Sequence, residues 1–317
     1  MEHILPVPTV KKSSTSRRKN FKVPSFPNNG YREDDPDYSL VFVPESRFEK
    51  LQQWSMDKSN SLKCGPVDFT FEVAHRIISF RSWLHTPDMD AVMYLFREYT
   101  ALRRWTEDRV VFVDCYFAAQ LEGAYKKLLE GKRTFEFNKR LLHYAIGELP
   151  SHGRTKKIFD VDVDRLYAPV NVNGNHWISL CVNFVQRTVE VFDCNGFKYG
   201  KLVEAFSVLM PRLVKEVQSP KNKKQLNVKP YGIQYAQVKR GSNKAQCDCG
   251  VYALKYIECH ARGLDLSLMH DDNINIARMK IACDLFDAAN DPVFIDRMSR
   301  YEPISWETEE IDLDPDL

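Results

Sequence analysis

The stretch Asp-Cys-Gly-Val-Tyr-Ala-Leu-Lys-Tyr-Ile-Glu-Cys-His, residues 248–260, decides the interpretation of this chain. Apolar residues recur in it at helical spacing, at Val251, Leu254 and Ile257, and Gly263 is typical of a helix end. Asp248 is a good N-cap residue, so Cys249 is expected at the helix N-terminus, where unpaired N–H groups and the helix dipole stabilise a thiolate. A single cysteine is more often a small buried hydrophobe, so this feature alone leaves both interpretations open.

A thiolate nucleophile needs a proton acceptor, and His176 is the candidate. It follows the turn-like run 173–175 and opens a predicted strand over Trp177–Phe184, while Asp193 ends the next predicted strand, Thr188–Phe192. If these strands form an antiparallel hairpin, both residues lie at one edge, and the carboxylate can orient the imidazole. A turn centred on residues 186–187 would leave the two side chains offset along the strands, so the sequence leaves the register open.

A zinc site is the competing use of the same residue types, which recur at Cys247, Cys249, Cys259 and His260. Cys249 and Cys259 are ten residues apart on one predicted helix, or about 15 Å at the usual rise. One zinc ion cannot bind both thiolates, so the spacing argues against a metal centre, and we expect none.

Between its ends the chain mixes predicted helices and strands without strict alternation, which favours an α+β fold. We expect a strand at Tyr38–Val43, a helix at Glu45–Trp54, a strand at Val110–Val113 and a Lys-rich loop at Ser219–Pro230. Thr86-Pro87-Asp88 reads as a helix start with Thr86 as N-cap. Further helices are expected at Cys115–Leu128, Leu202–Val217, Gly250–Ala261 and Ile274–Ala288.

Three segments in the order His176-Trp177, Val191-Phe192-Asp193 and Asp248-Cys249-Gly250-Val251-Tyr252 resemble the ubiquitin-like-protein-specific (SUMO-type) cysteine protease family. The plant branch is especially similar in its nucleophile helix. The resemblance covers roughly residues 40–300 and implies a papain-like fold, with a mixed central sheet flanked by helices and the nucleophile at a helix N-terminus. It also implies a catalytic Cys249, His176 and Asp193.

The resemblance further places Trp83 and Trp177 in a narrow tunnel that admits the Gly-Gly tail of a modifier. The alternative is that both are core tryptophans. Relatives usually have Gln six positions before the nucleophile as the oxyanion donor, but this chain has Asn243, with Gln246 and Gln237 as fallback candidates. Thr86 stands where relatives carry Asp, although Asp90 matches a second acidic position, and Cys247 stands where Gly is common.

The composition is that of a globular protein, with 44% apolar and 28% charged residues. A net charge of +2 predicts no strong affinity for nucleic acid or membrane, and no apolar run reaches the ~18 residues that span a bilayer. We expect a disordered basic segment over residues 1–37, a catalytic domain over 38–301 and an acidic tail over 302–317. Residues 1–8 do not resemble a signal peptide, and a basic cluster at Lys11–Lys19 favours an intracellular protein in the nucleus rather than the cytoplasm.

Together these features predict a peptidase or isopeptidase that cleaves after the C-terminal glycine of a ubiquitin-like modifier and needs no cofactor. Its partners would be the modifier and its protein conjugates. Two rivals remain: a modifier-binding protein whose catalysis has decayed, and another acyl-chemistry enzyme such as a deubiquitinase or acetyltransferase. The sequence determines neither which modifier is read nor the oligomeric state.

Overall fold

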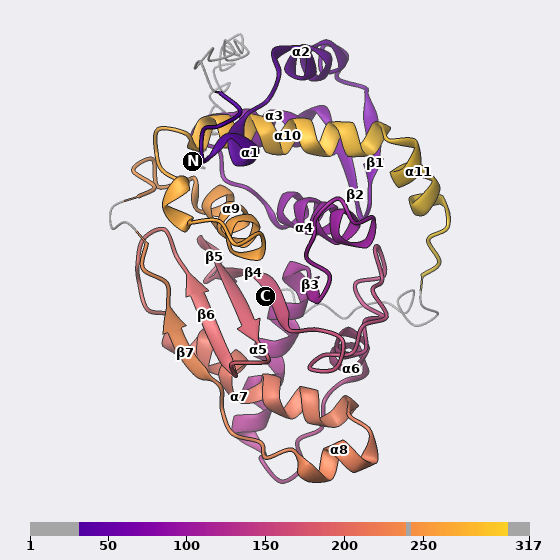
Figure 1. Cartoon of the computed structure of the whole chain (residues 1–317), viewed down its shortest axis with the longest axis vertical. Helices are drawn as coiled ribbons and strands as arrows, with labels where there is room; N and C mark the ends of the chain where they lie inside the picture. The colour runs from indigo at the N-terminus through magenta and orange to yellow at the C-terminus, as the bar shows by residue number, and fades with distance from the viewer. Residues whose placement is uncertain (1–31, 239–241, 304–317) are drawn as a thin grey trace, which may run out of the picture.

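The computed structural model describes residues 32–238 and 242–303, and its centre is a mixed five-stranded sheet in the order β3-β4-β5-β6-β7 (Figure 1). The strands are β3 (Val110–Phe112), β4 (Arg165–Val172), β5 (His176–Asn183), β6 (Thr188–Phe192) and β7 (Gly232–Tyr235). The inner pairs β4–β5 and β5–β6 are antiparallel, whereas the outer pairs β3–β4 and β6–β7 are parallel. The predicted α+β fold with a mixed central sheet is therefore confirmed.

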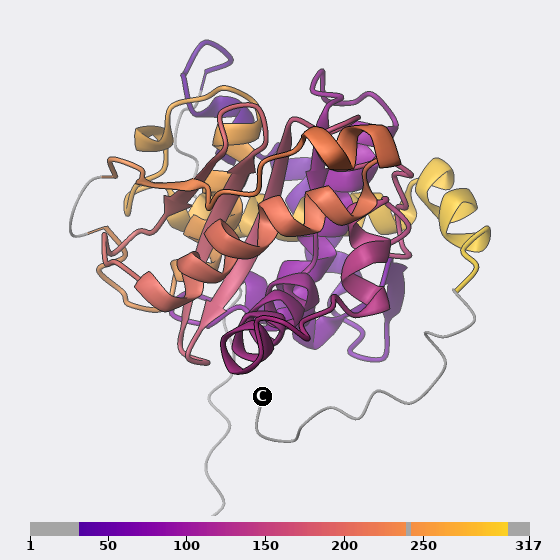
Figure 2. The same cartoon turned by 90° about the horizontal axis from the view of Figure 1, so that it is seen from below.

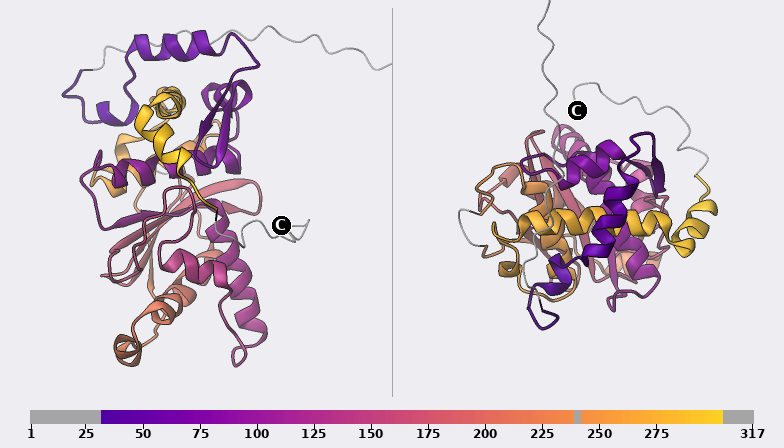
Figure 3. Two further views of the ribbon diagram at one scale, coloured as in Figure 1. Left: turned by 90° about the vertical axis from the view of Figure 1, so that its right-hand side faces the viewer. Right: turned by 90° about the horizontal axis from the view of Figure 1, so that it is seen from above.

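Helices cover both faces of this sheet, which explains why its inner strands are apolar almost throughout. Along β5, Trp177 and Cys181 belong to the core beneath α9 (Cys249–Ala261), whereas Ile178 and Leu180 belong to the opposite core. The first core also takes in α4 (Thr86–Ala101) and α10 (Ile274–Asn290), and the second takes in α5 (Cys115–Glu130) and α7 (Gly200–Val217). The views from below and from the side show helices on both sides of the sheet (Figures 2 and 3).

The remaining elements close the two cores at the periphery. They are α1 (Tyr38–Val41), α2 (Glu45–Trp54), β1 (Ser61–Cys64), β2 (Val67–Thr70), α3 (Phe71–Ile78), α6 (Lys139–Ala145), α8 (Pro220–Gln225), a 3₁₀ turn (Leu266–Leu268) and α11 (Pro292–Ser299). The helices predicted from Glu45, Cys115, Leu202, Gly250 and Ile274 are all present, with ends that differ by a few residues at most. Among the described residues, no helix is long and apolar enough to cross a membrane.

Three local predictions are wrong, each for a local reason. The run from Tyr38 is the helix α1 and not a strand. So short an apolar run fits the period of a helix as well as that of a strand. A tertiary contact holds the helix, because Lys255 Nζ donates a hydrogen bond to the Leu40 carbonyl at 2.7 Å. The Lys-rich loop contains α8, which begins at Pro220 behind a Ser219 cap. The N-cap of α4 is His85 and not Thr86, because the His85 N–H donates to Asp88 Oδ2 at 2.8 Å.

The predicted terminal segments lie largely outside the part of the chain that the structure describes. Of the basic segment, only residues 32–37 are described; they form a turn, and Asp37 Oδ2 accepts a hydrogen bond from Asn273 Nδ2 at 2.8 Å. Of the acidic tail, only residues 302–303 are described, and the basic cluster Lys11–Lys19 is outside the described residues altogether.

Candidate active site

Cys249 is the first residue of α9, as expected, and its side chain is fully buried. The next residue, Gly250, is tightly packed, because a Cβ there would lie 3.0 Å from the Leu84 Cβ and 3.3 Å from the Met89 sulfur, and these neighbours would have to shift to admit it. Asp248 occupies the N-cap position, but its carboxylate does not cap the helix and instead binds Arg278, with Nε to Oδ1 at 2.8 Å. The expected N-cap position of Asp248 is therefore confirmed, but its side chain makes no capping hydrogen bond.

His176 and Asp193 meet across the β5–β6 pair. The strands pair Ser179 with Phe192, and continuing that register by one residue sets Asp193 opposite Ile178, two residues from His176 along β5. The offset that the sequence left open is present, but residues two apart on a strand share one face. As a result, His176 Nε2 lies 2.7 Å from Asp193 Oδ1.

The turn that follows Asp193 holds its carboxylate in place. Oδ1 accepts the backbone N–H of Asn195 at 3.1 Å, and Oδ2 accepts that of Phe197 at 2.7 Å. The chain can wrap around the carboxylate because Gly196 has φ +70°, in the left-handed region that glycine tolerates. With Nε2 facing Asp193, Nδ1 is the ring nitrogen of His176 left to face the thiol of Cys249.

The environment of His176 favours a charged imidazole. Burial lowers the pKa of this side chain, but hydrogen bonds to Asp193 and Cys249 and the charges of both partners outweigh burial, and they raise the pKa from 6.5 to about 9. At neutral pH the ring is therefore protonated when it faces a thiolate. A thiolate beside an imidazolium at a helix N-terminus is the arrangement in which a cysteine acts as a nucleophile.

Asn243 lies at the site, whereas its fallback Gln246 does not. Asn243 is buried, its Oδ1 accepts the Asp248 N–H at 2.9 Å, and its side chain also hydrogen-bonds the thiol of Cys194. Gln246 is exposed and contributes only its backbone N–H, which donates to the Asn243 carbonyl at 2.8 Å. Gln237 is also exposed and, together with Asp193, lines a cavity whose lining does not include Cys249 or His176.

The two tryptophans have different surroundings. Trp177 is buried; its backbone N–H donates to Cys249 Sγ at 3.5 Å and its indole Nε1 donates to the Leu84 carbonyl at 2.9 Å. Trp83 is the residue before Leu84 and keeps 38% of its surface exposed, so it is not a plain core residue. The structure thus joins the Trp83 segment to Trp177, and Trp177 to the nucleophile.

Two neighbours of the site were not among the predicted residues. Cys194 is buried, with its sulfur within 4.8 Å of a ring nitrogen of His176 and a carboxylate oxygen of Asp193. Arg278 is fully buried and binds Asp248. A signal for Arg278 was present, because it interrupts the apolar face that Ile274 and Ile281 form on a predicted helix, and a charge at such a position needs a partner.

The residues weighed as zinc ligands are not gathered in the structure. Cys249 and Cys259 lie near opposite ends of α9. The ring of His260 is engaged elsewhere, because Nε2 lies 3.1 Å from a carboxylate oxygen of Glu190 and Nδ1 forms a hydrogen bond with the Tyr167 hydroxyl at 2.9 Å. Across the described residues, the group with metal-ligand geometry is His176, Asp193 and Cys194. Its imidazole and carboxylate are already bonded to each other, so the donor set does not fit a resident ion.

Residues 82–293 match the Ulp1 protease family, C-terminal catalytic domain. Ubiquitin-like-specific protease 1A of Arabidopsis thaliana is 24% identical over 246 residues, which cover 74% of this chain and 45% of that protein. The chain thus spans less than half the length of this relative.

Solved structures agree on the fold. The C-terminal Ulp1 protease domain in complex with Smt3, the yeast ortholog of SUMO, superposes with a TM-score of 0.55 at 15% identity, covering 79% of this chain and 98% of that one. The Ulp1-like SUMO protease catalytic domain of Chaetomium thermophilum gives 0.57 at 16% identity, covering 82% and 96%. With the family match extending over most of the described residues, the chain belongs to the Ulp1 protease family, as a C-terminal catalytic domain.

Proposed function

We propose that this protein is a cysteine peptidase that cleaves after the C-terminal glycine of a ubiquitin-like modifier of the SUMO type. The observation that carries the proposal is His176 held between Asp193, at 2.7 Å, and the thiol of Cys249 at the start of α9. Family membership and the modifier proteases among the relatives support it. Its partners are the modifier and its protein conjugates.

In the proposed reaction the Cys249 thiolate attacks the carbonyl carbon of the modifier's last glycine. The developing oxyanion accepts hydrogen bonds from the Cys249 N–H and the Asn243 amide. The His176 imidazolium gives its proton to the leaving amine as the C–N bond breaks, which leaves a thioester on Cys249. Water then attacks the thioester, neutral His176 takes a proton from it, and the modifier leaves with a free carboxylate while the thiolate and imidazolium are restored.

Trp83 and Trp177 supply selectivity for the glycine tail. Flat aromatic walls admit glycine but exclude residues with a Cβ, and the Trp177 indole is fixed by the Leu84 carbonyl. We assign the catalytic unit to residues 38–301, between a basic segment at 1–37 and an acidic tail at 302–317. The basic cluster Lys11–Lys19 supports action inside the cell, in the nucleus rather than the cytoplasm.

The test is a panel of ubiquitin-like modifiers that carry an electrophile at the C-terminus. A SUMO-type probe should form a covalent adduct with Cys249, located by peptide mapping, and Cys249→Ala should abolish it. Cys259→Ala removes another buried thiol of the same helix and should leave labelling unchanged. Labelling by the ubiquitin probe alone would point to a deubiquitinase instead. If no probe reacts although iodoacetamide modifies Cys249, the proposed substrate class is wrong.

A further inference from the structure

Arg278 of α10 is the fully buried centre of a hydrogen-bond network that reaches the segments on both sides of the candidate site. It contacts Asp248 through Nε at 2.8 Å and Nη2 at 2.6 Å, and Nη2 also approaches the Cys247 carbonyl at 3.4 Å. On the other side, Nη1 donates to the Ile77 carbonyl at 3.0 Å and Nη2 donates to the Ser82 carbonyl at 2.6 Å. One planar guanidinium thereby joins the two residues directly before Cys249 to Ser82, directly before Trp83, and to Ile77 near the end of α3.

The two joined segments also touch each other. Leu84 packs closely against Gly250, since a Cβ on that glycine would lie 3.0 Å from the Leu84 Cβ, and the Leu84 carbonyl accepts the Trp177 indole N–H. A rigid fork with five donors fixes directions as well as distances, which a lysine cannot do. Arg278 therefore sets how the nucleophile turn lies against the segment that carries Trp83.

Arg278 also compensates a charge. Asp248 is buried beside Cys249, and an unpaired carboxylate there would oppose formation of the thiolate. Among the residues that the structure describes, the other titratable groups that interact with Cys249 are His176 with its partner Asp193, the thiols of Cys194 and Cys247, and the phenol of Tyr199. Among these described neighbours, Arg278 is the cation paired with Asp248.

We propose that Arg278 is a positioning residue for the nucleophile, in two ways. It holds the turn before Cys249 against the Trp83 segment, and it neutralises Asp248 so that Cys249 can carry negative charge. The first role rests on the proposed function, because the relative placement of the two segments matters for cleavage of a modifier tail. The second role concerns the thiol itself and can be measured without any modifier.

The experiment combines two readouts on the full chain: kcat and KM for modifier cleavage, and the pH dependence of Cys249 alkylation by iodoacetamide. Arg278→Lys keeps the charge but loses the fork, so we expect kcat to fall about 10- to 100-fold while KM changes less than about threefold. Arg278→Met leaves Asp248 uncompensated and should move the midpoint of alkylation upward by about one pH unit. Asp248→Asn should move the alkylation midpoint downward. Combining Arg278→Met with Asp248→Asn should return the midpoint towards that of the wild type without restoring kcat.

The matched control is Lys280→Met, which removes an ion pair with Asp284 two residues further along α10 and should change neither readout. Wild-type kcat in Arg278→Lys would overturn the positioning role, and equal midpoints in Asp248→Asn and the wild type would overturn the charge role. Both variants keep the volume of the site nearly constant, so they remain informative if Arg278→Met does not fold. If the midpoints shift as expected but the wild type cleaves no modifier, the proposed function fails while the charge role stands.

Discussion

The two ends of α9 are held by different kinds of polar contact. At its N-terminus, Cys249 faces the His176–Asp193 pair, and the hydrogen bonds and charges there raise the pKa of His176 and favour its imidazolium form. In its C-terminal half, Lys255 and Glu258 form an ion pair at 2.7 Å within a buried network. The difference shows that one helix separates its proposed chemistry from anchoring: the charged groups at its start surround the Cys249 thiol, and those further along cancel one another.

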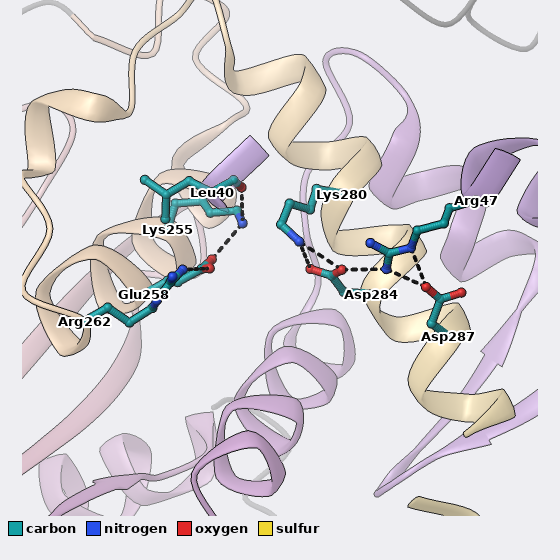
Figure 4. Close-up of polar contacts among 8 residues, drawn as sticks. All are labelled: Leu40, Arg47, Lys255, Glu258, Arg262, Lys280, Asp284 and Asp287. Atoms are coloured by element: carbon teal, nitrogen blue, oxygen red, sulfur yellow. Dashed lines mark hydrogen bonds and ion pairs between the residues drawn. The ribbon is translucent and has the colours of Figure 1, made fainter. Parts of the chain in front are cut away.

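The anchoring network extends to neighbouring elements (Figure 4). Lys255 Nζ also donates to the Leu40 carbonyl at 2.7 Å, and Glu258 accepts Arg262 Nη1 at 3.2 Å. On α10, Asp284 forms ion pairs with Lys280 at 2.8 Å and with Arg47 at 3.0 Å, and Arg47 also forms an ion pair with Asp287. Burial alone would raise the pKa of Asp284, but Lys280, Lys255 and Arg47 lower it. Because Lys255 belongs to α9 and Asp284 to α10, the charged groups of the two helices act on one another.

Removing the nucleophile should give the largest loss of activity. We expect Cys249→Ser to reduce turnover by about 10⁴- to 10⁶-fold, since the hydroxyl is a far weaker nucleophile than a thiolate. The melting temperature should stay within a few degrees, because the substitution is nearly isosteric. Initial rates on a modifier fusion and thermal melts measure the two effects. Retention of more than about a tenth of the activity would remove Cys249 from the chemistry.

Asp193→Asn should reduce turnover less, by about 10²- to 10³-fold, because a thiolate depends less on its base than the serine hydroxyl for which a ~10⁴-fold loss is typical. It should also move the alkaline limb of the pH–rate profile to lower pH, since Asp193 helps to raise the pKa of His176 to about 9. The comparison is between the limbs of the two profiles. An unchanged limb with wild-type turnover would show that Asp193 does not act on His176.

The His176–Asp193 pair also predicts how the free energy of unfolding depends on pH. The folded-state pKa of His176, about 9, lies above its ordinary value of 6.5, so its protonated form stabilises the fold. This contribution is complete below pH 6.5 and is lost as the pH rises from 6.5 towards 9. Urea unfolding of the wild type should show that loss over this window, and Asp193→Asn should show less of it.

The sequence predicted the chemical end of α9 better than the anchoring end. The chemical end comprises His176, Asp193 and Cys249, each of which lies at the boundary of a strand or helix. Turn residues and apolar periodicity in the neighbouring sequence reveal such boundaries. The order of these three residues along the chain then supplied the family resemblance. Lys255 contacts a carbonyl 215 residues away and Arg278 a carboxylate 30 residues away, and no local pattern states such partners. The strands β4 and β7 and the α8 helix were also missed, because tertiary packing rather than local propensity decides them.

Asn243→Ala should lower kcat about 10- to 100-fold with little change in KM, because its amide would meet a charge that exists only in the transition state. Asn243→Gln is the sharper variant, since it restores the residue usual in the family. The Oδ1 of Asn243 binds the Asp248 N–H, and its backbone has φ +60° in a tight turn. We therefore expect the longer side chain to lose that bond and slow turnover. Faster turnover in Asn243→Gln would show that the turn accepts the longer side chain.

The smallest effect on turnover should come from the other end of α9. Lys255→Met leaves Glu258 buried, with Arg262 as its remaining ion-pair partner among the described residues, so the free energy of unfolding should fall by about 3–5 kcal/mol, the usual range when one member of a buried ion pair is removed. Turnover per folded molecule should stay within about twofold, because the hydrogen-bond partners that the structure describes for Lys255 are the Leu40 carbonyl and Glu258, which lie outside the site.

Lys126→Met is the matched control for that prediction, since it removes a solvent-exposed ion pair with Glu122 and should cost less than about 1 kcal/mol. Lys255→Met combined with Glu258→Gln should recover part of the loss, because the stranded carboxylate is then gone. Urea unfolding and active-site titration separate stability from turnover. A tenfold loss of turnover per titrated site in Lys255→Met would mean that the anchoring charges reach the nucleophile, and that the two ends of α9 act as one unit rather than two.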